Sequence, residues 1–507
     1  MKLLYNFIAK WFAISLLIHL VLAWFSIGFY NFDEHFQILE FAGNKAGFIK
    51  SSLLTWEFGA EIRSAFQPYL AYLVIRFLAF FHAYDPFLTA TILRLLSAVV
   101  GWGSSVLVTV AGLQYIHDPR PRKFFIVTSS VFVPIIFIHA HFSSEGWSGT
   151  LAFAGIALVL ICMQKENQLK ANWNNFLLLI SGLFMGMSYI CRFQAVIMII
   201  IFMIWLLFMT NLSFKKLAII CSGIFIAVLF GIVLDRMFYG EWVNTAYRYF
   251  DANIIKGVAA NFGTEPWWWY IIETAKSNFY YLQIPMMILI LIGFITNLKN
   301  PFVWVSLGFI LVHFAISHKE LRFLFPLADA LPMLLFLGIA NIISLLKVRT
   351  IAHRSPSIIV LIAFILLNAA TLINLCISPS CSFLYPMRYI YSNCKLPADV
   401  IITDPYIDRL TARTLKMNFY IQTGCKYRYI EFSKIDSFIN VQKKEKLPFI
   451  LMDWAENFGP KNSPRSLKGL ALTEYDQYPD WIRNFNFAGW VERTSFWHVY
   501  QTRPYQN

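Results

Sequence analysis

Long apolar runs recur along this chain from Phe7 to Leu375, and they constrain its fold more than any other feature. Runs of about 18 residues or more can cross a bilayer as helices. Only 14% of the residues are charged, whereas soluble globular chains carry about 25%. The pattern therefore predicts an all-α polytopic membrane protein. The first run has no convincing small-residue cleavage site, so we interpret it as a retained helix rather than a removed signal peptide.

The basic residues indicate how the chain is oriented. The net charge is +14, and the basic side chains fall largely in short loops between apolar runs, as expected for cytoplasmic loops. We therefore expect a cytoplasmic N-terminus. No basic stripe with interleaved aromatic residues is present, so nucleic acid is not an expected partner.

This orientation predicts about eleven crossings by helices of around 20 residues. The apolar segment 68–81 is short and carries Arg76. A crossing there would place the basic loop 117–123 outside, so we expect this segment to lie along the interface or to dip in and return. The expected spans are roughly 11–30, 87–116, 124–142, 146–163, 174–190, 194–210, 217–234, 279–297, 301–317, 323–346 and 357–377.

The composition changes at about residue 378, where charge rises and the apolar runs shorten to strand length. The segments 398–406 and 447–454 are β-branched or apolar runs that end at Asp-Pro or Asp-Trp, which is typical of buried strands. We therefore expect two domains. Residues 1–377 would form the transmembrane domain, and residues 378–507 a small α/β domain on the outer face.

The predicted orientation places all the unusual polar segments on the outer face. Ionisable residues within or beside membrane spans are costly and usually mark function, so several at one face suggest a single site. These segments are 31–40, 55–64, 141–147, 189–194, 235–270 and 317–323.

The segment "SHKELRF" (317–323) has the most unusual polar cluster. His318 and Arg322 are four residues apart, so on a helix they would share one face with Lys319 adjacent. Three such donors would make an anion clamp, although snorkelling of basic side chains to headgroups is an alternative. Arg192 interrupts a long apolar stretch; it would suit a phosphate as a planar cation, or it belongs to an ordinary hairpin turn.

Other polar residues also have two interpretations. Asp33 and Glu34 directly follow the first span; they form a solvated turn or supply a general base. Glu145 fits the start of a helix. The aromatic run 266–270 fits an interfacial belt or a surface that stacks on sugar rings. The sequence has no GxxxxGK[ST], HExxH or GxGxxG pattern, so neither nucleotide hydrolysis nor a Rossmann cofactor is indicated.

Several of these segments together resemble glycosyltransferase family 22, the lipid-phosphate-mannose-dependent mannosyltransferases. "HKELRF" (318–323) is similar to the family signature HKExRF, and "FDEHFQILE" (32–40) is similar to its HPDExFQ motif. The order agrees over about residues 30–330. Asn31-Phe32 replaces His-Pro, and Glu265 and Trp268 occupy positions where the family often has His. The remaining matches are "TWEFGAEIRSAFQP" (55–68) with TWE…RS…P, "YGEW" (239–242) with YGxW, and "FGTEPWWWY" (262–270) with FGTHPWHWY.

The resemblance implies a GT-C fold with its active site on the luminal or periplasmic face. It implies inverting transfer of mannose from a dolichyl or polyprenyl phosphate carrier to a glycan hydroxyl on an acceptor that is also lipid-linked. We expect Asp33 to act as base and Glu34 to orient it, with no cofactor and no metal required. The expected phosphate ligands are His318, Lys319, Arg322 and Arg192. The expected sugar or acceptor contacts are Glu57, Glu145, Trp242, Glu265, Trp267 and Trp268.

Three alternatives stay open at this point. The donor sugar is another lipid-phosphate-linked sugar, the chain is a transporter, or it is a non-catalytic lipid-binding subunit. A transporter of this size would be expected to show charges near the bilayer midplane and related halves, and the sequence shows neither. The sequence does not distinguish a bacterial inner membrane from the ER membrane, and it does not identify the acceptor, the linkage or the oligomeric state.

Overall fold

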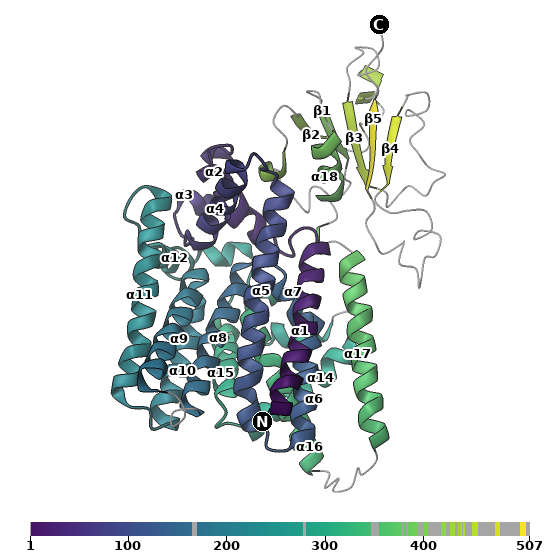
Figure 1. Cartoon of the computed structure of the whole chain (residues 1–507). Helices are drawn as coiled ribbons and strands as arrows, with labels where there is room; N and C mark the ends of the chain where they lie inside the picture. The colour runs from purple at the N-terminus through teal and green to yellow at the C-terminus, as the bar shows by residue number, and fades with distance from the viewer. Residues whose placement is uncertain are drawn as a thin grey trace. The chain divides into compact units, whose positions relative to one another are not determined.

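The computed structural model shows a helical chain with one sheet near its C-terminal end (Figure 1). The chain divides into two compact units. Unit 1 comprises residues 1–24, 56–74 and 91–376, and unit 2 comprises residues 25–55, 75–90 and 377–507. The described residues are 2–164, 170–276, 280–345, 354–377, 380–381, 384–393, 399–403, 417–421, 426–430, 434, 437–438, 440–441, 449–454, 472–476 and 497–502.

The helices follow the apolar runs closely. The α-helices are α1 (Lys2–Phe25), α2 (Glu40–Lys45), α3 (Trp56–Gly59), α4 (Phe66–Phe80), α5 (Pro86–Gly112), α6 (Pro119–Val131), α7 (Val133–His139), α8 (Ser144–Gln164), α9 (Ala171–Cys191), α10 (Val196–Met209), α11 (Phe214–Tyr239), α12 (Thr245–Phe250), α13 (Trp269–Ala275), α14 (Tyr280–Thr296), α15 (Pro301–Ala315), α16 (Leu331–Leu345), α17 (Arg354–Ile377) and α18 (Leu384–Asn393). The short 3-10 and π-helical segments are η1 (Glu34–Leu39), η2 (Ser51–Leu53), η3 (Leu113–Tyr115), η4 (Phe193–Ala195), η5 (Asp251–Ile255), η6 (Val258–Phe262), η7 (Leu321–Ala330) and η8 (Asn418–Tyr420).

The described residues contain six helices that are long and apolar enough to cross a membrane, or up to eight if each of two bent pairs is one span. The polytopic helical class is therefore confirmed, whereas the count of eleven crossings stays a prediction. One bent pair, α14 with α15, turns by 114° between the expected spans 279–297 and 301–317. The expected interfacial segment 68–81 lies largely in α4, which has 15 residues.

The expected span 124–142 is broken into α6 and α7, which meet at an angle of 44°. The break falls at Phe132, two residues before Pro134. Proline has no N–H to donate, and within a continuous helix its ring would clash with the carbonyl group four residues earlier. The freed N–H of Val133 donates to the Asn368 side chain at 2.8 Å. A neighbouring helix thus satisfies the group that the break leaves without a helical partner.

Helix α8 is the most buried span of unit 1, with 89% of its apolar window inside the structure. It packs against α9, α10, α7 and η7. Large buried rings fill the core around it, including Phe153 on α8 itself. Because α8 is enclosed along its length, a polar residue at its N-terminal end contacts neighbouring helices rather than lipid.

Helices α9 and α11 approach closely through two glycines. A Cβ added to Gly182 would lie 2.1 Å from the Ile220 carbonyl oxygen, and one added to Gly223 would lie 2.3 Å from the Leu179 oxygen. Both obstacles are backbone atoms, which cannot rotate away. Small residues at such crossings let helix backbones pack directly in membranes.

Unit 2 contains η1, α2, α18, η8 and a five-stranded sheet with the order β2-β1-β3-β5-β4. Strand β1 is parallel to β2 and β3, whereas β5 is antiparallel to β3 and β4. Two of these strands, β1 and β3, lie within the segments 398–406 and 447–454 in which strands were expected. Much of the expected domain 378–507 lies outside the described residues, so its domain character and outer-face position stay predictions. The strands are β1 (Asp399–Thr403), β2 (Lys426–Tyr429), β3 (Phe449–Trp454), β4 (Leu472–Asp476) and β5 (Trp497–Thr502).

We expect Gly223→Leu to lower the thermal unfolding midpoint, because overpacking a tight contact costs about 1–3 kcal/mol. Gly103→Leu is the matched control, since nothing lies within 4 Å of a Cβ added to Gly103, which is also in a long helix. The midpoint would be measured in detergent from the monodisperse fraction after heating. Equal midpoints for the two variants would contradict the close crossing of α9 and α11.

Candidate functional site

A cluster of arginine and glutamate side chains lies at the N-terminal end of α8. Glu145 is in the first turn of that helix, and Arg192 follows the last residue of α9. The Arg192 Nη1 atom lies 3.1 Å from the Glu145 Oε1 atom, and the two side chains are 7% and 3% exposed. Arg322 Nη1 lies 3.7 Å from the same oxygen. Two guanidinium groups therefore share one buried carboxylate.

His318 lies in the non-helical link before η7, whereas Arg322 lies within η7, so the predicted shared helix face is wrong. Residues 316–320 link α15 to η7, and Glu320 is extended, with φ −139° and ψ 143°. Pairing comes instead through Glu320, whose carboxylate accepts from Arg322 Nε at 2.6 Å and Nη2 at 2.8 Å. The same carboxylate lies 3.3 Å from His318 Nε2. The two residues thus meet on a common carboxylate between them.

The Lys319 side chain turns away from this pair, toward the C-terminal end of α15. Its ammonium donates to the carbonyl oxygens of His313 at 3.1 Å and Phe314 at 2.9 Å, and also to that of Ile316. Free carbonyl groups at a helix C-terminus attract a cation. Burial lowers the pKa of the Lys319 ammonium, while the carbonyl oxygens favour its charged form. Lys319 therefore fixes the end of α15.

The backbone of η7 lies directly against α8. A Cβ added to Gly149 would lie 2.3 Å from the Pro326 carbonyl oxygen. This approach brings Phe323 beside both arginines, whose Cζ atoms lie 5.5 Å and 5.6 Å from its ring centroid. Guanidinium groups are suited to bidentate contact with carboxylate or phosphate anions.

A small cavity opens beside the cluster. Its lining includes Glu145, Arg192, Gln194, His313 and Phe323. Gln194 donates to the Tyr249 hydroxyl, and the Cζ atom of a third arginine, Arg63, lies 5.7 Å from the Tyr249 ring centroid. The expected segment 55–64 is thereby linked to the segment 189–194.

The loop 262–268 docks on the same region. The Glu265 N–H donates to the Ser317 oxygen at 2.8 Å, and His318 Nδ1 donates to the Gly263 oxygen at 2.9 Å. Trp267 and Trp268 are 57% and 47% exposed. The two motifs therefore meet through hydrogen bonds to backbone carbonyl oxygens, and the tryptophan rings remain accessible.

Two further predicted contacts lie elsewhere in unit 1. Trp242 is 70% exposed, and the Arg236 Cζ atom lies 6.0 Å from its ring centroid. Glu57 Oε1 lies 3.6 Å from Arg63 Nη2. Unit 1 thus brings Glu145, Arg192, His318 and Arg322 together around shared carboxylates, and it places Trp242 outside that cluster.

The acidic pair Asp33 and Glu34 belongs to unit 2, where it opens the π-helix η1. Glu34 is buried, and its Oε1 atom accepts from the Asn31 N–H at 3.3 Å. The Asp33 N–H donates to Asn31 Oδ1 at 3.2 Å. Asn31, which replaces the expected family histidine, is thus the residue that shapes this turn.

Sequence reasoning missed a second polar network in unit 1. His19 Nδ1 donates to the Ser15 oxygen at 2.8 Å, and His19 Nε2 lies 3.2 Å from His139 Nδ1. His139 Nε2 in turn lies 3.2 Å from Asp329 Oδ1. The signal was available, since all three are ionisable residues in or beside apolar runs, but their sequence separations gave no reason to combine them.

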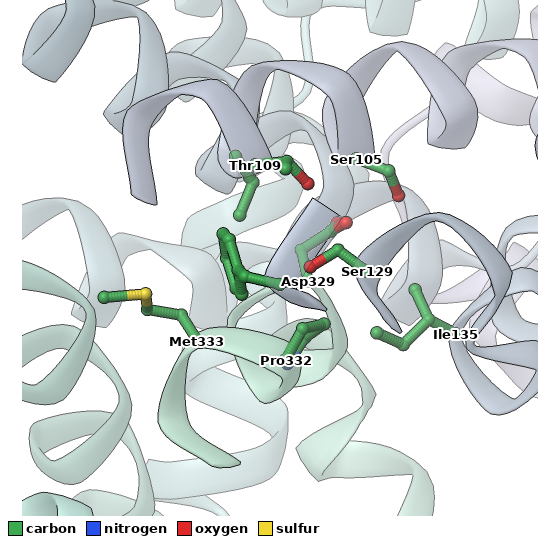
Figure 2. A pocket seen from close by; sticks show the side chains of 9 residues that line it. Ser105, Thr109, Ser129, Ile135, Asp329, Pro332 and Met333 are labelled. Carbon is green, nitrogen blue, oxygen red and sulfur yellow. The ribbon is translucent and has the colours of Figure 1, made fainter. Parts of the chain in front are cut away.

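Figure 2 shows the cavity beside Asp329, into which hydroxyl groups from two helices are directed. Ser105 and Thr109 come from α5, and Ser129 comes from α6. The buried Ser129 hydroxyl has no hydrogen-bond partner among the described residues. Among the residues that the structure describes, no group of three or more His, Cys, Asp or Glu side chains could hold a metal ion.

The fold and the arginine cluster define a class: a polytopic membrane protein with buried guanidinium groups that pair with a carboxylate. The chain belongs to the Alg9-like mannosyltransferase family, whose model matches residues 10–390. This segment includes Asp33, Glu145, Arg192 and Arg322. The resemblance to glycosyltransferase family 22 is confirmed.

Similar proteins support the same family. The chain is 26% identical to GPI mannosyltransferase 3 of Candida albicans over 309 residues, which cover 61% of this chain and 58% of that protein. It is 24% identical to GPI mannosyltransferase 3 of Gibberella zeae over 63% of this chain and 58% of that protein. The matches thus span less than two thirds of the length of these relatives.

The fold is similar to that of a solved membrane protein. ArnT from Cupriavidus metallidurans, in a crystal structure bound to undecaprenyl phosphate, matches with a TM-score of 0.51 and 10% identity. The alignment covers 97% of this chain and 98% of that one. At this identity the similarity concerns the fold alone, and it supports the expected GT-C architecture.

We expect Glu145→Gln and Arg192→Met each to destabilise the protein strongly, because removing one partner of a buried ion pair costs about 3–5 kcal/mol. The double variant should lose less unfolding free energy than the two single variants combined, since it leaves no unpaired charge at this position. Glu273→Gln is the control, because its pair with Lys276 is largely exposed and such pairs contribute about 0–1 kcal/mol. Denaturant unfolding in lipid discs would measure all four, and strictly additive losses would contradict the ion pair.

Proposed function

We propose that this chain is an inverting mannosyltransferase that moves mannose from a dolichyl- or polyprenyl-phosphate carrier to a lipid-linked glycan acceptor. The observation that carries the proposal is the family match over residues 10–390, which includes the buried arginine cluster. The names of relatives support it. Several are GPI mannosyltransferases, and a Schizosaccharomyces pombe relative, 26% identical over 137 residues, has a name that pairs Dol-P-Man with Man(7)GlcNAc(2)-PP-Dol.

The lipid phosphate would bind at Arg192 and Arg322. Both guanidinium groups are already neutralised by Glu145 and Glu320. Binding of the donor therefore exchanges a carboxylate for a phosphate rather than filling a vacant cationic site. Charge-assisted, bidentate contacts from arginine favour phosphate oxygens. His318 can donate to the same anion once it leaves Glu320.

Lys319 has a different role in this scheme. Its ammonium is held by three carbonyl oxygens at the end of α15. Moving it onto a phosphate would expose those carbonyl groups without a partner. We therefore assign Lys319 to positioning the loop that carries His318 and Glu320, in place of the direct phosphate contact expected from the sequence.

The chemical step is a single displacement at the mannose anomeric carbon. The bond from that carbon to the phosphate oxygen breaks, and the acceptor oxygen forms the new bond from the opposite side. The acceptor proton passes to Asp33, with Glu34 orienting the base or the acceptor. The departing lipid phosphate needs no acid, because arginine side chains stabilise its charge.

Glu57, Glu145, Trp242, Glu265, Trp267 and Trp268 are the proposed sugar and acceptor contacts. Exposed tryptophan rings suit the apolar faces of sugars. Glu145 acts mainly as the carboxylate that the donor phosphate replaces. The basic loops favour an active site on the luminal or periplasmic side.

We expect Asp33→Asn to retain its fold and its binding of the lipid donor while transfer falls by about 10²–10⁴-fold, the usual contribution of a general base. The assay would follow radiolabelled polyprenyl-phosphate-mannose into lipid-linked acceptors extracted from the source organism, with purified protein in lipid. Asp251→Asn, which alters a surface pair with Lys256, is the control and should transfer normally. Near-wild-type transfer by Asp33→Asn would rule out the base role. Transfer by the wild-type protein only from other lipid-phosphate sugars would show that the donor sugar is not mannose.

A further inference from the structure

The acidic pair of unit 2 lies at the start of an unusual backbone element. Asp33 is the N-cap of η1, a π-helix that runs from Glu34 to Leu39. The N–H of Glu40, which follows, donates to the His35 carbonyl oxygen, five residues earlier. π-Helical turns are rare and occur frequently at functional sites, because the wider turn is less favourable than an α-helical one. Something in the structure must therefore hold it.

A side-chain pair spans the same five residues as the backbone bond. His35 Nε2 lies 2.9 Å from Glu40 Oε1, and the two residues are 0% and 1% exposed. In an α-helix the neighbours on one face are three or four residues apart. A contact between residues five apart therefore favours the π-turn over an α-turn.

The other partners of Glu40 come from the C-terminal part of the chain. The Phe419 N–H donates to Glu40 Oε1 at 2.9 Å, and the Asn418 side chain donates to Oε2 at 3.4 Å. A buried carboxylate needs such donors, since burial without them is costly. Residues 418 and 419 lie beyond the segment 10–390 that the family model matches.

The same C-terminal segment also packs on the imidazole. The His35 ring stacks on two aromatic rings, with a centroid distance of 5.4 Å and an interplanar angle of 15° to Tyr420, and 5.3 Å and 28° to Phe29. Tyr420 and Phe419 are each 1% exposed. Residues 418–420, the helix η8, thus cover both halves of the His35–Glu40 pair.

We propose that η8 and the His35–Glu40 pair are a positioning device for the acidic pair. This inference rests on the proposed function, because it gives Asp33 a catalytic role. If the π-turn relaxed to an α-turn, residues upstream of it would shift by one place in the helix register, about 100° around the axis. Glu34 is the first residue of η1 and Asp33 directly precedes it, so their carboxylates would turn away from their present directions.

The proposal also assigns a role to the C-terminal part of the chain. Its residues 418–420 act on catalysis through Glu40 and His35, without contacting substrate. His35 and Glu40 are positioning residues in the same sense. A purely structural role would lower the amount of folded enzyme, whereas a positioning role lowers the turnover of enzyme that is folded and binds its donor.

The test compares four variants of the full-length chain: Glu40→Gln, His35→Ala, His35→Gln and, as control, Lys50→Gln. Glu40→Gln removes the charge at nearly constant shape, and His35→Gln restores a donor close to the Nε2 position. Lys50 is exposed and precedes η2. Two readouts apply to each variant: hydrogen–deuterium exchange of the peptide covering residues 33–41, and kcat and KM for the lipid donor.

We expect Glu40→Gln and His35→Ala to speed exchange in residues 33–41 and to lower kcat at least tenfold while KM changes less than about twofold. His35→Gln should recover most of the protection from exchange and most of kcat, and Lys50→Gln should match wild type in both readouts. Unchanged exchange, or faster exchange with unchanged kcat, would overturn the positioning role. Full transfer by Asp33→Asn would rule out the catalytic role of the acidic pair, and the positioning role would fail with it. That variant therefore distinguishes a failure of the proposed function from a failure of the positioning role alone.

Discussion

The ion pair between Arg192 and Glu145 is the contact on which the polar site of unit 1 depends. Both side chains are buried, so removing the Glu145 carboxylate would leave the Arg192 charge uncompensated. Glu145 is fixed at the start of the most enclosed helix, and Arg192 is fixed where α9 ends. Arg322 and Phe323 then join from η7, whose backbone touches α8 at Gly149. The cluster is thus built around one carboxylate, and any incoming anion must compete with it.

The sequence was most informative where a physical rule acts locally. Apolar length predicted the helices, and the cost of ionisable groups in an apolar setting drew attention to Arg192, His318 and Arg322. The direction of Lys319 was not predictable, because it depends on carbonyl groups that become available only where α15 ends. The same holds for Glu320, which was not among the expected site residues but which binds both His318 and Arg322.

Contacts between distant segments were beyond sequence reasoning. Glu40 and Phe419 are 379 residues apart, and no periodicity connects the start of α2 to a short turn near the C-terminal end. The π-turn was likewise hidden, since its five-residue repeat differs by only one position from the α-helical repeat. The motif around Asp33 identified the acidic pair, whereas the groups that orient it became evident only from the fold of unit 2.

The contacts from Ser15 through His19 to His139 have a consequence for charge. The Ser15 carbonyl oxygen can only accept, so His19 Nδ1 carries a proton. The next contact joins two ring nitrogens that would repel as bare lone pairs, so it also holds one proton. Two protons are the number that two neutral imidazoles carry together, so neither ring needs a positive charge. The interior of unit 1 therefore contains a polar connection between α1 and α7 that adds no net charge to an apolar environment.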